Sequence, residues 1–330
     1  MHFSTYLQQA LNGQCLPEPL YQKFCVFHQN YIDAATKKCS VPRAEALCLQ
    51  WLKVILDDLK NPFIFPAYHR KIRSPIDLFT LSIDFFSVVI DDDHSRVLNI
   101  DRFNEIQKYL SRGDNVILLA NHQTECDPHL MYCILGQTYP ELMEKIIFIA
   151  GDRVTSDPLA RPFSMGCDLL RIYSKRHINT PPELREGKLH HNQKSMKILK
   201  TLLHEGAKLI YVAPSGGRDR KNQAGELFPA EFDPESIEMF RLLAKSSGQV
   251  THFYPFALKT YDILPPPPKI EETIGEERVI FFAPVFFNIG NELDLNQLYS
   301  KDDVSYDKHQ QRVLRAKKIF SIVKELYEEF

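Results

Sequence analysis

The sequence Val-Ile-Leu-Leu-Ala-Asn-His-Gln-Thr-Glu-Cys-Asp-Pro, residues 116–128, passes from an apolar run through a polar loop to a proline. Five consecutive apolar residues are typical of a buried strand. Asp127 in front of Pro128 is typical of a helix start, with an N-cap followed by proline at the first helical position. We therefore predict a strand over 116–120, a loop, and a helix that begins at Pro128.

Strand and helix patterns alternate in this way from about residue 80 onward. Short apolar runs predict strands at 116–120, 146–150, 169–173, 209–213, 253–258 and 279–282, and helical spacing predicts helices at 128–135, 193–204 and 234–246. The alternation predicts an α/β fold with a mixed, largely parallel sheet flanked by helices. In such sheets, ligands bind beyond the carboxyl ends of the strands.

The N-terminal part of the chain has a different pattern. Apolar residues recur at helical spacing in 21–31 and 42–59, and prolines at 62 and 66 end the pattern. A length of 330 residues suits two domains. We therefore predict a small helical domain over 1–75 and an α/β domain over 76–330. The segment 307–330 also has helical spacing, which predicts a terminal helix packed on the core.

Composition indicates an ordinary folded protein. The chain is 44% hydrophobic and 25% charged, which excludes collagen, coiled coil and global disorder.

The longest apolar window, 78–90, is too short to span a bilayer, and no secretory signal or transit peptide is visible. Seven cysteines without a C-x-x-C pair favour free thiols in a reducing compartment. We therefore expect a soluble, cytoplasmic protein.

The positive charge is unevenly distributed. The net charge is −2, yet residues 151–221 hold 14 Lys and Arg against 7 Asp and Glu, a local excess of seven. Such a segment could attract nucleic acid, anionic lipid or a phosphorylated small molecule, or it could be a solvated face.

His122 and Asp127 are the first candidates for catalysis. On one continuous helix, residues five apart would point about 140° away from each other. Across a turn from strand to helix, the two side chains can converge. A carboxylate bonded to one imidazole nitrogen fixes the tautomer, and the other nitrogen is then able to remove a proton from a hydroxyl. The pattern predicts a general-base pair without a covalent intermediate.

Two other interpretations of the same loop stay open. Cys126 could be a nucleophile paired with a histidine, and His122, Glu125, Asp127 and His129 could bind a metal. Neither set has the spacing of a standard site such as H-E-x-x-H. We expect no metal.

Two further strand ends carry basic residues. Ala213-Pro-Ser-Gly-Gly-Arg-Asp-Arg220 follows one predicted strand, and Ser174-Lys-Arg-His177 follows another. Paired glycines let backbone N–H groups approach an anion, and the arginines suit a phosphate. The loop lacks the Gly-Lys-Ser/Thr of a P-loop, and Ala213 breaks the G-x-S-x-G pattern, although Ser215 as a hydrolase nucleophile stays an alternative. We predict a phosphate site where the two segments converge.

These motifs together resemble those of a known family. His122 through Asp127 is the H-x4-D signature of glycerolipid acyltransferases, and the chain is similar to the soluble, plastid-type glycerol-3-phosphate acyltransferases. The likeness extends over 150–154, 157–159, 162–166, the Pro-Ser-Gly-Gly-Arg-Asp-Arg run at 214–220, and 254–255 with 261–268. These blocks in this order are more specific than H-x4-D alone.

The resemblance implies an activity and roles for residues. Members transfer a fatty acyl group from acyl carrier protein or coenzyme A to the sn-1 hydroxyl of glycerol 3-phosphate, which gives lysophosphatidic acid and begins glycerophospholipid synthesis. By resemblance, His122 is the general base and Asp127 orients it. The implied phosphate-binding residues are Lys175, Arg176, His177, Arg218 and Arg220, with Arg176 in place of a lysine in plant members. No cofactor beyond the acyl thioester, no nucleic acid and at most weak membrane contact are expected.

Two functions of other classes remain alternatives at this stage. A serine hydrolase using Ser215 would cleave acyl esters without glycerol 3-phosphate. A noncatalytic phospholipid-binding protein would use the basic segment and the terminal helix on anionic membranes.

Overall fold

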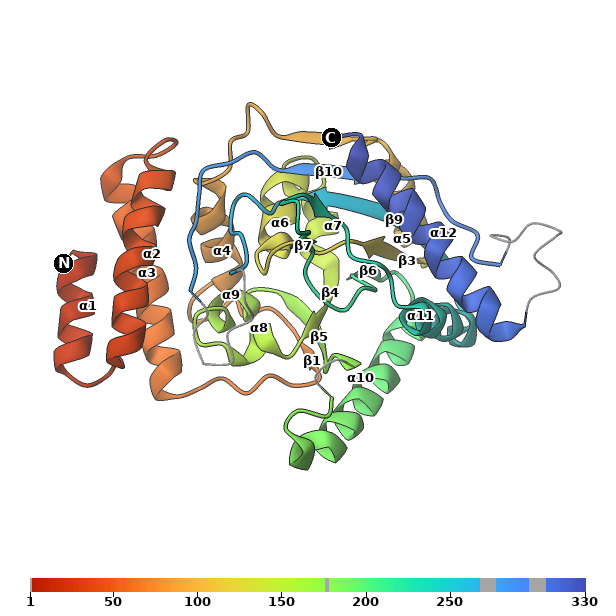
Figure 1. The fold of residues 1–330 in the computed structure, drawn as a ribbon, viewed down its shortest axis with the longest axis horizontal. Helices are drawn as coiled ribbons and strands as arrows, with labels where there is room; N and C mark the ends of the chain where they lie inside the picture. The colour runs from red at the N-terminus through yellow and green to blue at the C-terminus, as the bar shows by residue number, and fades with distance from the viewer. Residues whose placement is uncertain (1, 176–177, 268–276, 297–306) are drawn as a thin grey trace.

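The computed structural model describes residues 2–175, 178–267, 277–296 and 307–330. Its helices are α1 (Phe3–Asn12), α2 (Glu18–Ala35), α3 (Val41–Lys60), α4 (Leu78–Ser87), α5 (Arg102–Ser111), α6 (Asp127–Thr138), α7 (Pro140–Lys145), α8 (Arg153–Ser156), α9 (Arg161–Ser164), α10 (Arg185–Glu205), α11 (Pro234–Ser247) and α12 (Lys308–Glu328), with a 3-10 turn η2 (Pro182–Leu184) before α10. Figure 1 shows α1–α3 together at one end of the molecule, beyond α4.

The strands form a mixed sheet with a parallel centre. They are β1 (Tyr68–His69), β2 (Arg96–Leu98), β3 (Asn115–Ala120), β4 (Ile146–Gly151), β5 (Asp168–Ile172), β6 (Leu209–Val212), β9 (Thr251–Lys259) and β10 (Phe286–Ile289), in the spatial order β1-β5-β4-β6-β3-β9-β10-β2. From β5 to β9 all neighbours are parallel, and antiparallel pairs occur at β1–β5 and β9–β10. A separate hairpin joins β7 (Arg220–Lys221) to β8 (Leu227–Phe228). The predicted α/β fold with a largely parallel sheet is confirmed.

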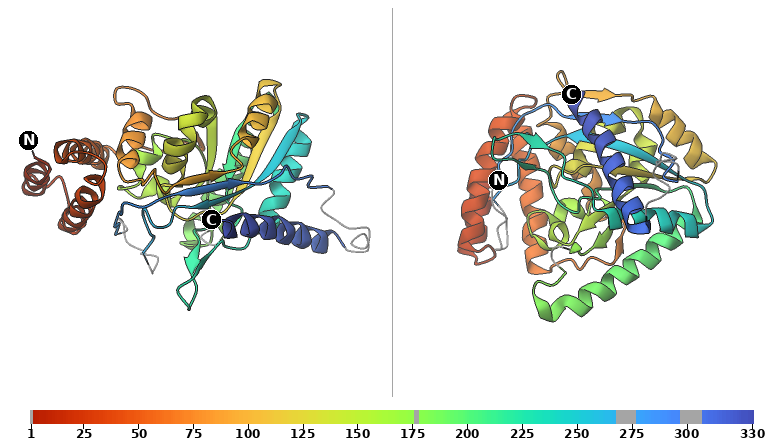
Figure 2. Two further views of the ribbon diagram at one scale, coloured as in Figure 1. Left: turned by 90° about the horizontal axis from the view of Figure 1, so that it is seen from above. Right: turned by 45° about the vertical axis from the view of Figure 1, so that its right-hand side comes forward.

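Strand β3 contacts both of the helical layers that cover the sheet. Successive side chains of a strand point to opposite faces, and every residue of β3 is buried. Val116 and Leu118 belong to a hydrophobic cluster with α1–α6, whereas Ile117 and Leu119 belong to a second cluster with α10–α12. Burial on both faces is why this strand reads as an uninterrupted apolar run. Figure 2 shows the two layers of helices on opposite sides of the sheet.

The N-terminal helices pack on the first of these layers. Helix α3 contacts α4 and α9, and side chains such as Phe24 and Trp51 belong to the same cluster as the buried face of the sheet. The predicted helices at 21–31 and 42–59 lie within α2 and α3. The division into domains at residue 75 stays a prediction.

One predicted strand is wrong. Residues 279–282 are apolar but form no strand, and the strand of this region is β10, which begins at Phe286. Ala283 makes a single bridge to Ile90. Pro284 follows, and a proline has no N–H to donate to a sheet, so regular pairing begins only after it. The other five predicted strands and all predicted helices are confirmed within a few residues at either end of each helix or strand, apart from α10, which starts eight residues earlier.

The terminal helix α12 is packed on the core as predicted. Ile319 and Val323 are fully buried, and α12 contacts both β9 and α11. Asp307 caps the helix through a capping box with Gln310. Within the described part of the chain, no helix is both long and apolar enough to cross a membrane.

Candidate active site

The loop between β3 and α6 carries the predicted catalytic pair. Asp127 is the first residue of α6 and Cys126 precedes it as the N-cap, so the predicted capping role of Asp127 is wrong by one position. The Asp127 carboxylate instead faces back into the loop, where it accepts bonds from the backbone N–H groups of Gln123 (2.9 Å) and Thr124 (3.2 Å). The carboxylate therefore shapes the turn that separates strand from helix.

The same carboxylate binds His122. Nδ1 of His122 lies 2.7 Å from Oδ2 of Asp127, and Thr260 donates its hydroxyl to Oδ1 at 2.6 Å. Asp127 is completely buried, whereas the His122 side chain is 28% exposed. An ionised carboxylate only accepts, so Nδ1 carries the proton. Among the described residues, Nε2 of His122 has no hydrogen-bond partner, and it is therefore available to take a proton.

Buried polar side chains hold the loop on both sides of His122. The Asn121 side chain exchanges two hydrogen bonds with the backbone of Leu258, at 2.9 and 2.8 Å. Oε1 of Gln123 accepts from the N–H groups of Thr260 (2.8 Å) and Tyr261 (3.0 Å). Leu258 lies on β9 and Thr260 and Tyr261 follow it directly, so the last strand of the parallel centre fixes the catalytic loop.

Gln123 also reaches the terminal helix. Its Nε2 donates to the hydroxyl of Tyr327 on α12, at 3.2 Å. The two residues are 204 positions apart in the sequence. Helix α12 thus contributes to the environment of His122 without contacting it.

The predicted phosphate residues are only partly described. Arg176 and His177 lie outside the described residues. Nζ of Lys175 forms an ion pair with Asp233 at 2.8 Å and is largely exposed. Arg218 and Arg220 are half-buried, and Arg220 donates to the carbonyl of Pro267 at 2.7 Å.

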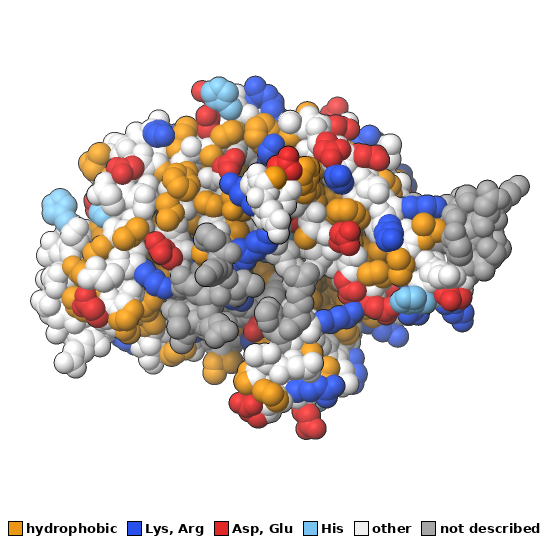
Figure 3. Space-filling model, viewed as in Figure 1, with side chains coloured by type: hydrophobic (Ala, Val, Ile, Leu, Met, Phe, Trp, Pro, Cys, Tyr) orange, Lys and Arg blue, Asp and Glu red, His pale blue; other side chains and the backbone are white. Residues whose placement is uncertain are grey.

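The arginine segment does meet the catalytic loop. The N–H of Asp219 donates to the carbonyl oxygen of His122 at 2.6 Å. Arg218 and Arg220 are therefore attached to a residue that contacts His122 directly. Figure 3 shows Lys and Arg side chains interspersed with Asp and Glu on one face of the molecule rather than gathered in one basic field. The phosphate site at Lys175, Arg176, His177, Arg218 and Arg220 stays a prediction.

The alternative chemistries receive no support from the geometry. Burial raises the pKa of the Cys126 thiol well above its usual range, so the thiolate of a nucleophile is disfavoured. The Ser215 hydroxyl donates to the Gly217 carbonyl at 2.9 Å rather than to a histidine. Glu125 is held by Arg278, and within the described residues no three His, Cys, Asp or Glu side chains are placed to hold a metal ion.

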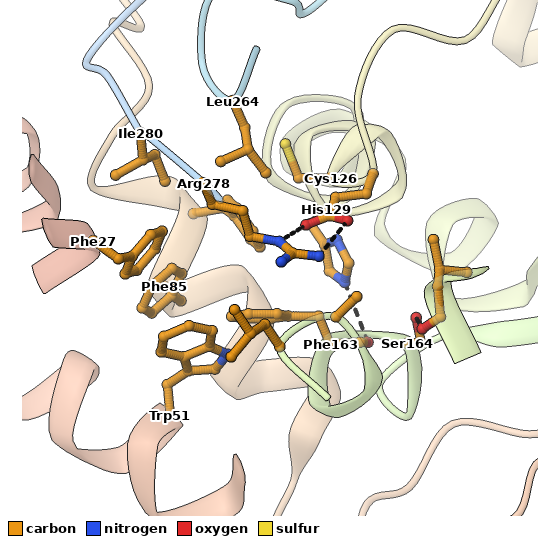
Figure 4. Close-up of a pocket in the computed structure, with 15 residues that line it drawn as sticks. Phe27, Trp51, Phe85, Cys126, His129, Phe163, Ser164, Leu264, Arg278 and Ile280 are labelled. Carbon is orange, nitrogen blue, oxygen red and sulfur yellow. Dashed lines mark hydrogen bonds and ion pairs between the residues drawn. The ribbon is translucent and has the colours of Figure 1, made fainter. Parts of the chain in front are cut away.

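A narrow, mainly apolar cavity of about 20 Å³, which is room for about one water molecule, adjoins the loop (Figure 4). Its lining includes Phe27, Trp51, Phe85, Phe86 and Phe163, together with Glu125, Cys126, His129 and Arg278. N-terminal helices α2 and α3 thus supply one wall, and the H-x4-D loop supplies another.

The polar groups of this pocket are deeply buried. Nη2 of Arg278 lies 2.9 Å from Glu125 and 3.3 Å from Asp157, and its Nε also bonds Glu125. Burial lowers the pKa of His129 to about 4, so this imidazole is neutral. Within the described part of the chain, Nδ1 of His129 and Nε1 of Trp51 have no hydrogen-bond partner.

Several of these residues were not identified by sequence analysis. Thr260 follows a predicted strand end and Asp219 lies between two predicted phosphate residues, so their positions were weak signals. Arg278 gave no signal, because it belongs to no motif and meets Glu125 from 153 residues away.

Comparison with known proteins defines the class. The family model described as Acyltransferase matches residues 102–259, which include β3, the H-x4-D loop and β9. The chain therefore contains an acyltransferase domain over residues 102–259.

Particular relatives within that class are chloroplastic glycerol-3-phosphate acyltransferases. That of Spinacia oleracea is 41% identical over 278 residues, covering 83% of this chain and 58% of the relative. That of Carthamus tinctorius is 38% identical over 298 residues, covering 88% of this chain and 64% of the relative. The chain therefore spans about three fifths of the length of these relatives.

A solved structure was also found. The 1-acyl-sn-glycerophosphate acyltransferase PlsC of Thermotoga maritima aligns over 77% of this chain and 78% of its own, with 16% identity and a TM-score of 0.39. The fold described above rests on the strands and helices of this chain alone.

Proposed function

We propose that the protein transfers a fatty acyl group from an acyl thioester, of acyl carrier protein or coenzyme A, to the sn-1 hydroxyl of glycerol 3-phosphate. The product is lysophosphatidic acid. The observation that carries the proposal is the His122–Asp127 pair, with a fully buried carboxylate 2.7 Å from an imidazole that is 28% exposed. The names of the relatives supply the acceptor.

The reaction needs one general base. Nε2 of His122 takes the proton of the sn-1 hydroxyl while the oxygen attacks the thioester carbonyl carbon. Asp127 stabilises the imidazolium that forms, because its negative charge lies against Nδ1. The C–S bond then breaks, and the leaving thiolate takes the proton back from His122. No acyl-enzyme is formed, and we expect no metal or other cofactor.

The arginine segment is suited to the phosphate of the acceptor. Arg218 and Arg220 lie on either side of Asp219, whose N–H contacts the His122 carbonyl. A phosphate bound there would hold the acceptor at the segment that contacts the His122 loop. We propose that Lys175, Arg176 and His177 complete this phosphate site.

Location and membrane contact are separate proposals. All seven cysteines are free thiols, which a reducing compartment preserves. We propose a cytoplasmic location with weak, salt-sensitive attachment to anionic lipid, although the names of the relatives place those proteins in the chloroplast. Fractionation at low and high salt measures both.

The test is a transfer assay. Purified protein is mixed with labelled glycerol 3-phosphate and either an acyl-coenzyme A or an acyl carrier protein thioester, and labelled lysophosphatidic acid is measured. His122→Ala should reduce kcat by roughly 10² to 10⁴, whereas His190→Ala, an exposed histidine on α10, should leave it unchanged. Transfer with neither donor, or full activity in folded His122→Ala, would refute the proposal.

A further inference from the structure

Asp219 occupies an unusual place in the site. It is completely buried, and it lies between Arg218 and Arg220. Its N–H donates to the carbonyl oxygen of His122 at 2.6 Å. The backbone of the arginine segment is therefore attached to the backbone of the general base itself.

The Asp219 carboxylate binds the residues on both sides of His122. Oδ2 accepts from Nδ2 of Asn121 at 2.8 Å and from Nε2 of Gln123 at 3.3 Å. Oδ1 accepts from the N–H of Ala230 at 2.8 Å. One side chain thus holds the two neighbours of His122, while its own backbone holds the His122 carbonyl.

The two amide groups cannot turn away from Asp219. Oδ1 of Asn121 accepts from the N–H of Leu258, and Oε1 of Gln123 accepts from the N–H of Thr260. Each amide oxygen is thereby fixed on β9 or just beyond it, so each NH₂ group must face Asp219. An amide at position 219 would turn an NH₂ group either toward these two donors or toward the Ala230 N–H, and each buried donor that loses its acceptor costs about 1–3 kcal/mol.

The carboxylate keeps its place despite a cost of burial. Among the described residues, no Lys or Arg forms an ion pair with it, and burial raises its pKa to about 6. His122 interacts with it electrostatically and acts in the opposite direction, lowering this pKa.

We infer that Asp219 is a positioning residue for the acyl transfer proposed above: it fixes the loop around His122 and joins that loop to the arginines that hold the acceptor phosphate. The inference rests on the proposed function for its substrate, and on the contacts of Asp219 for its geometry. Asp219 acts through its neighbours and touches neither substrate nor reacting atoms.

The test compares two buried carboxylates. Asp219→Asn keeps the shape of the side chain and replaces one acceptor oxygen by a donor. The matched control is Asp168→Asn. Asp168 lies at the amino end of β5, whereas His122 follows the carboxyl end of β3, and its carboxylate accepts from the N–H of Lys71 at 2.7 Å. Both variants are studied below their unfolding temperatures, with the folded fraction measured by circular dichroism.

Kinetics separates positioning from phosphate binding. In Asp219→Asn we expect kcat to fall about 10- to 100-fold with the KM for glycerol 3-phosphate within threefold, and in Asp168→Asn we expect neither to change by more than twofold. A rise in KM at constant kcat would show that position 219 serves phosphate binding only and would overturn the inference. So would an unchanged kcat in folded Asp219→Asn.

A second readout does not depend on turnover. The Nδ1 proton of His122, bonded to Asp127, should give a downfield imidazole resonance in proton NMR of the ligand-free protein. Asp219→Asn should broaden or remove this resonance and Asp168→Asn should preserve it. If the wild type transfers no acyl group while the resonance responds as expected, the proposed function fails and the positioning role stands.

A second variant covers a failure to fold. If Asp219→Asn does not fold, Asn121→Ala removes one partner of the carboxylate and leaves the arginine segment intact. The same loss of kcat at constant KM is then expected, and normal kcat in folded Asn121→Ala would refute the role.

Discussion

Asp127→Asn removes the charge of the orienting carboxylate and keeps its shape. The buried carboxylate accepts from Nδ1 of His122, from two backbone N–H groups and from the Thr260 hydroxyl. An asparagine oxygen at the Oδ2 position still serves His122 and Gln123. Its NH₂ group then faces the Thr260 hydroxyl, which can turn to accept, and the Thr124 N–H, which loses its acceptor. One unsatisfied N–H costs about 1–3 kcal/mol, so the fold should survive with a moderate loss of stability.

The effect on catalysis follows from the lost charge. Two unit charges about 4 Å apart interact by about 4 kcal/mol at an effective dielectric constant of about 20. The imidazole of His122 is 28% exposed, and water reduces this energy to roughly 2–4 kcal/mol. Since about 1.4 kcal/mol corresponds to a tenfold change in rate, kcat should fall about 30- to 1,000-fold. The KM values should change little, because the charge matters mainly when the imidazolium forms.

Asp127→Ala should behave differently. It leaves the N–H groups of Gln123 and Thr124 and the hydroxyl of Thr260 without their acceptor in the interior. Each orphaned group costs about 1–3 kcal/mol, and their sum approaches the 5–15 kcal/mol by which domains are usually stable. The asparagine variant should therefore fold and turn over slowly, and the alanine variant should be largely unfolded.

The assay combines thermal unfolding with steady-state kinetics at a temperature where the asparagine variant is fully folded. Two results would refute the reasoning. One is a folded Asp127→Asn enzyme with kcat within threefold of wild type. The other is an Asp127→Ala protein as stable as wild type, which would mean that the loop does not depend on the carboxylate.

Three other predictions concern the phosphate site, the thiol and a buried histidine. Arg218→Ala should lower kcat/KM for glycerol 3-phosphate about 10- to 150-fold, because a charge-assisted contact to phosphate contributes about 1.5–3 kcal/mol. Arg218→Lys should recover only part of this loss. Unchanged kinetics in Arg218→Ala would mean that Arg218 does not bind the phosphate. Cys126→Ser and chelator treatment should each leave most activity intact, whereas zinc-dependent rescue after chelation would contradict this. The pKa of His129 is lowered to about 4, so the unfolded chain binds a proton that the folded chain does not between pH 6.5 and 4, and stability is lost as pH falls through that window. His129→Phe should remove about 3 kcal/mol of this pH dependence in urea unfolding, and an identical dependence in both proteins would count against it.

The catalytic pair could be predicted because its members are close in sequence. His122 and Asp127 are five residues apart, and a strand followed by an Asp-Pro helix start specifies the turn between them. The fold class could also be predicted from local sequence, because a strand that is buried on both faces, such as β3, has an uninterrupted run of apolar residues. Local patterns also misled, because residues 279–282 are apolar without being a strand.

The support around the pair could not be predicted. Thr260 reaches Asp127 from 133 residues away, and Asp219 reaches Asn121 from 98 residues away. Such contacts depend on which strands become neighbours in the sheet, and local sequence patterns do not predict the order of the strands. Charge counts indicated a basic segment, but only the Asp219 contact with His122 showed that this segment meets the catalytic loop.

The bond between Gln123 and Tyr327 has a consequence for the order in which the site is built. A ribosome adds about 5–20 residues per second, so the 204 residues between them take roughly 10 to 40 seconds to synthesise. The backbone partners of Gln123 at Thr260 and Tyr261 are made 137 and 138 residues after it, so they are missing for most of that time, and the Tyr327 hydroxyl is missing for all of it. A nascent chain therefore carries His122 and Asp127 on a loop that gains its full set of hydrogen bonds only when α12 docks.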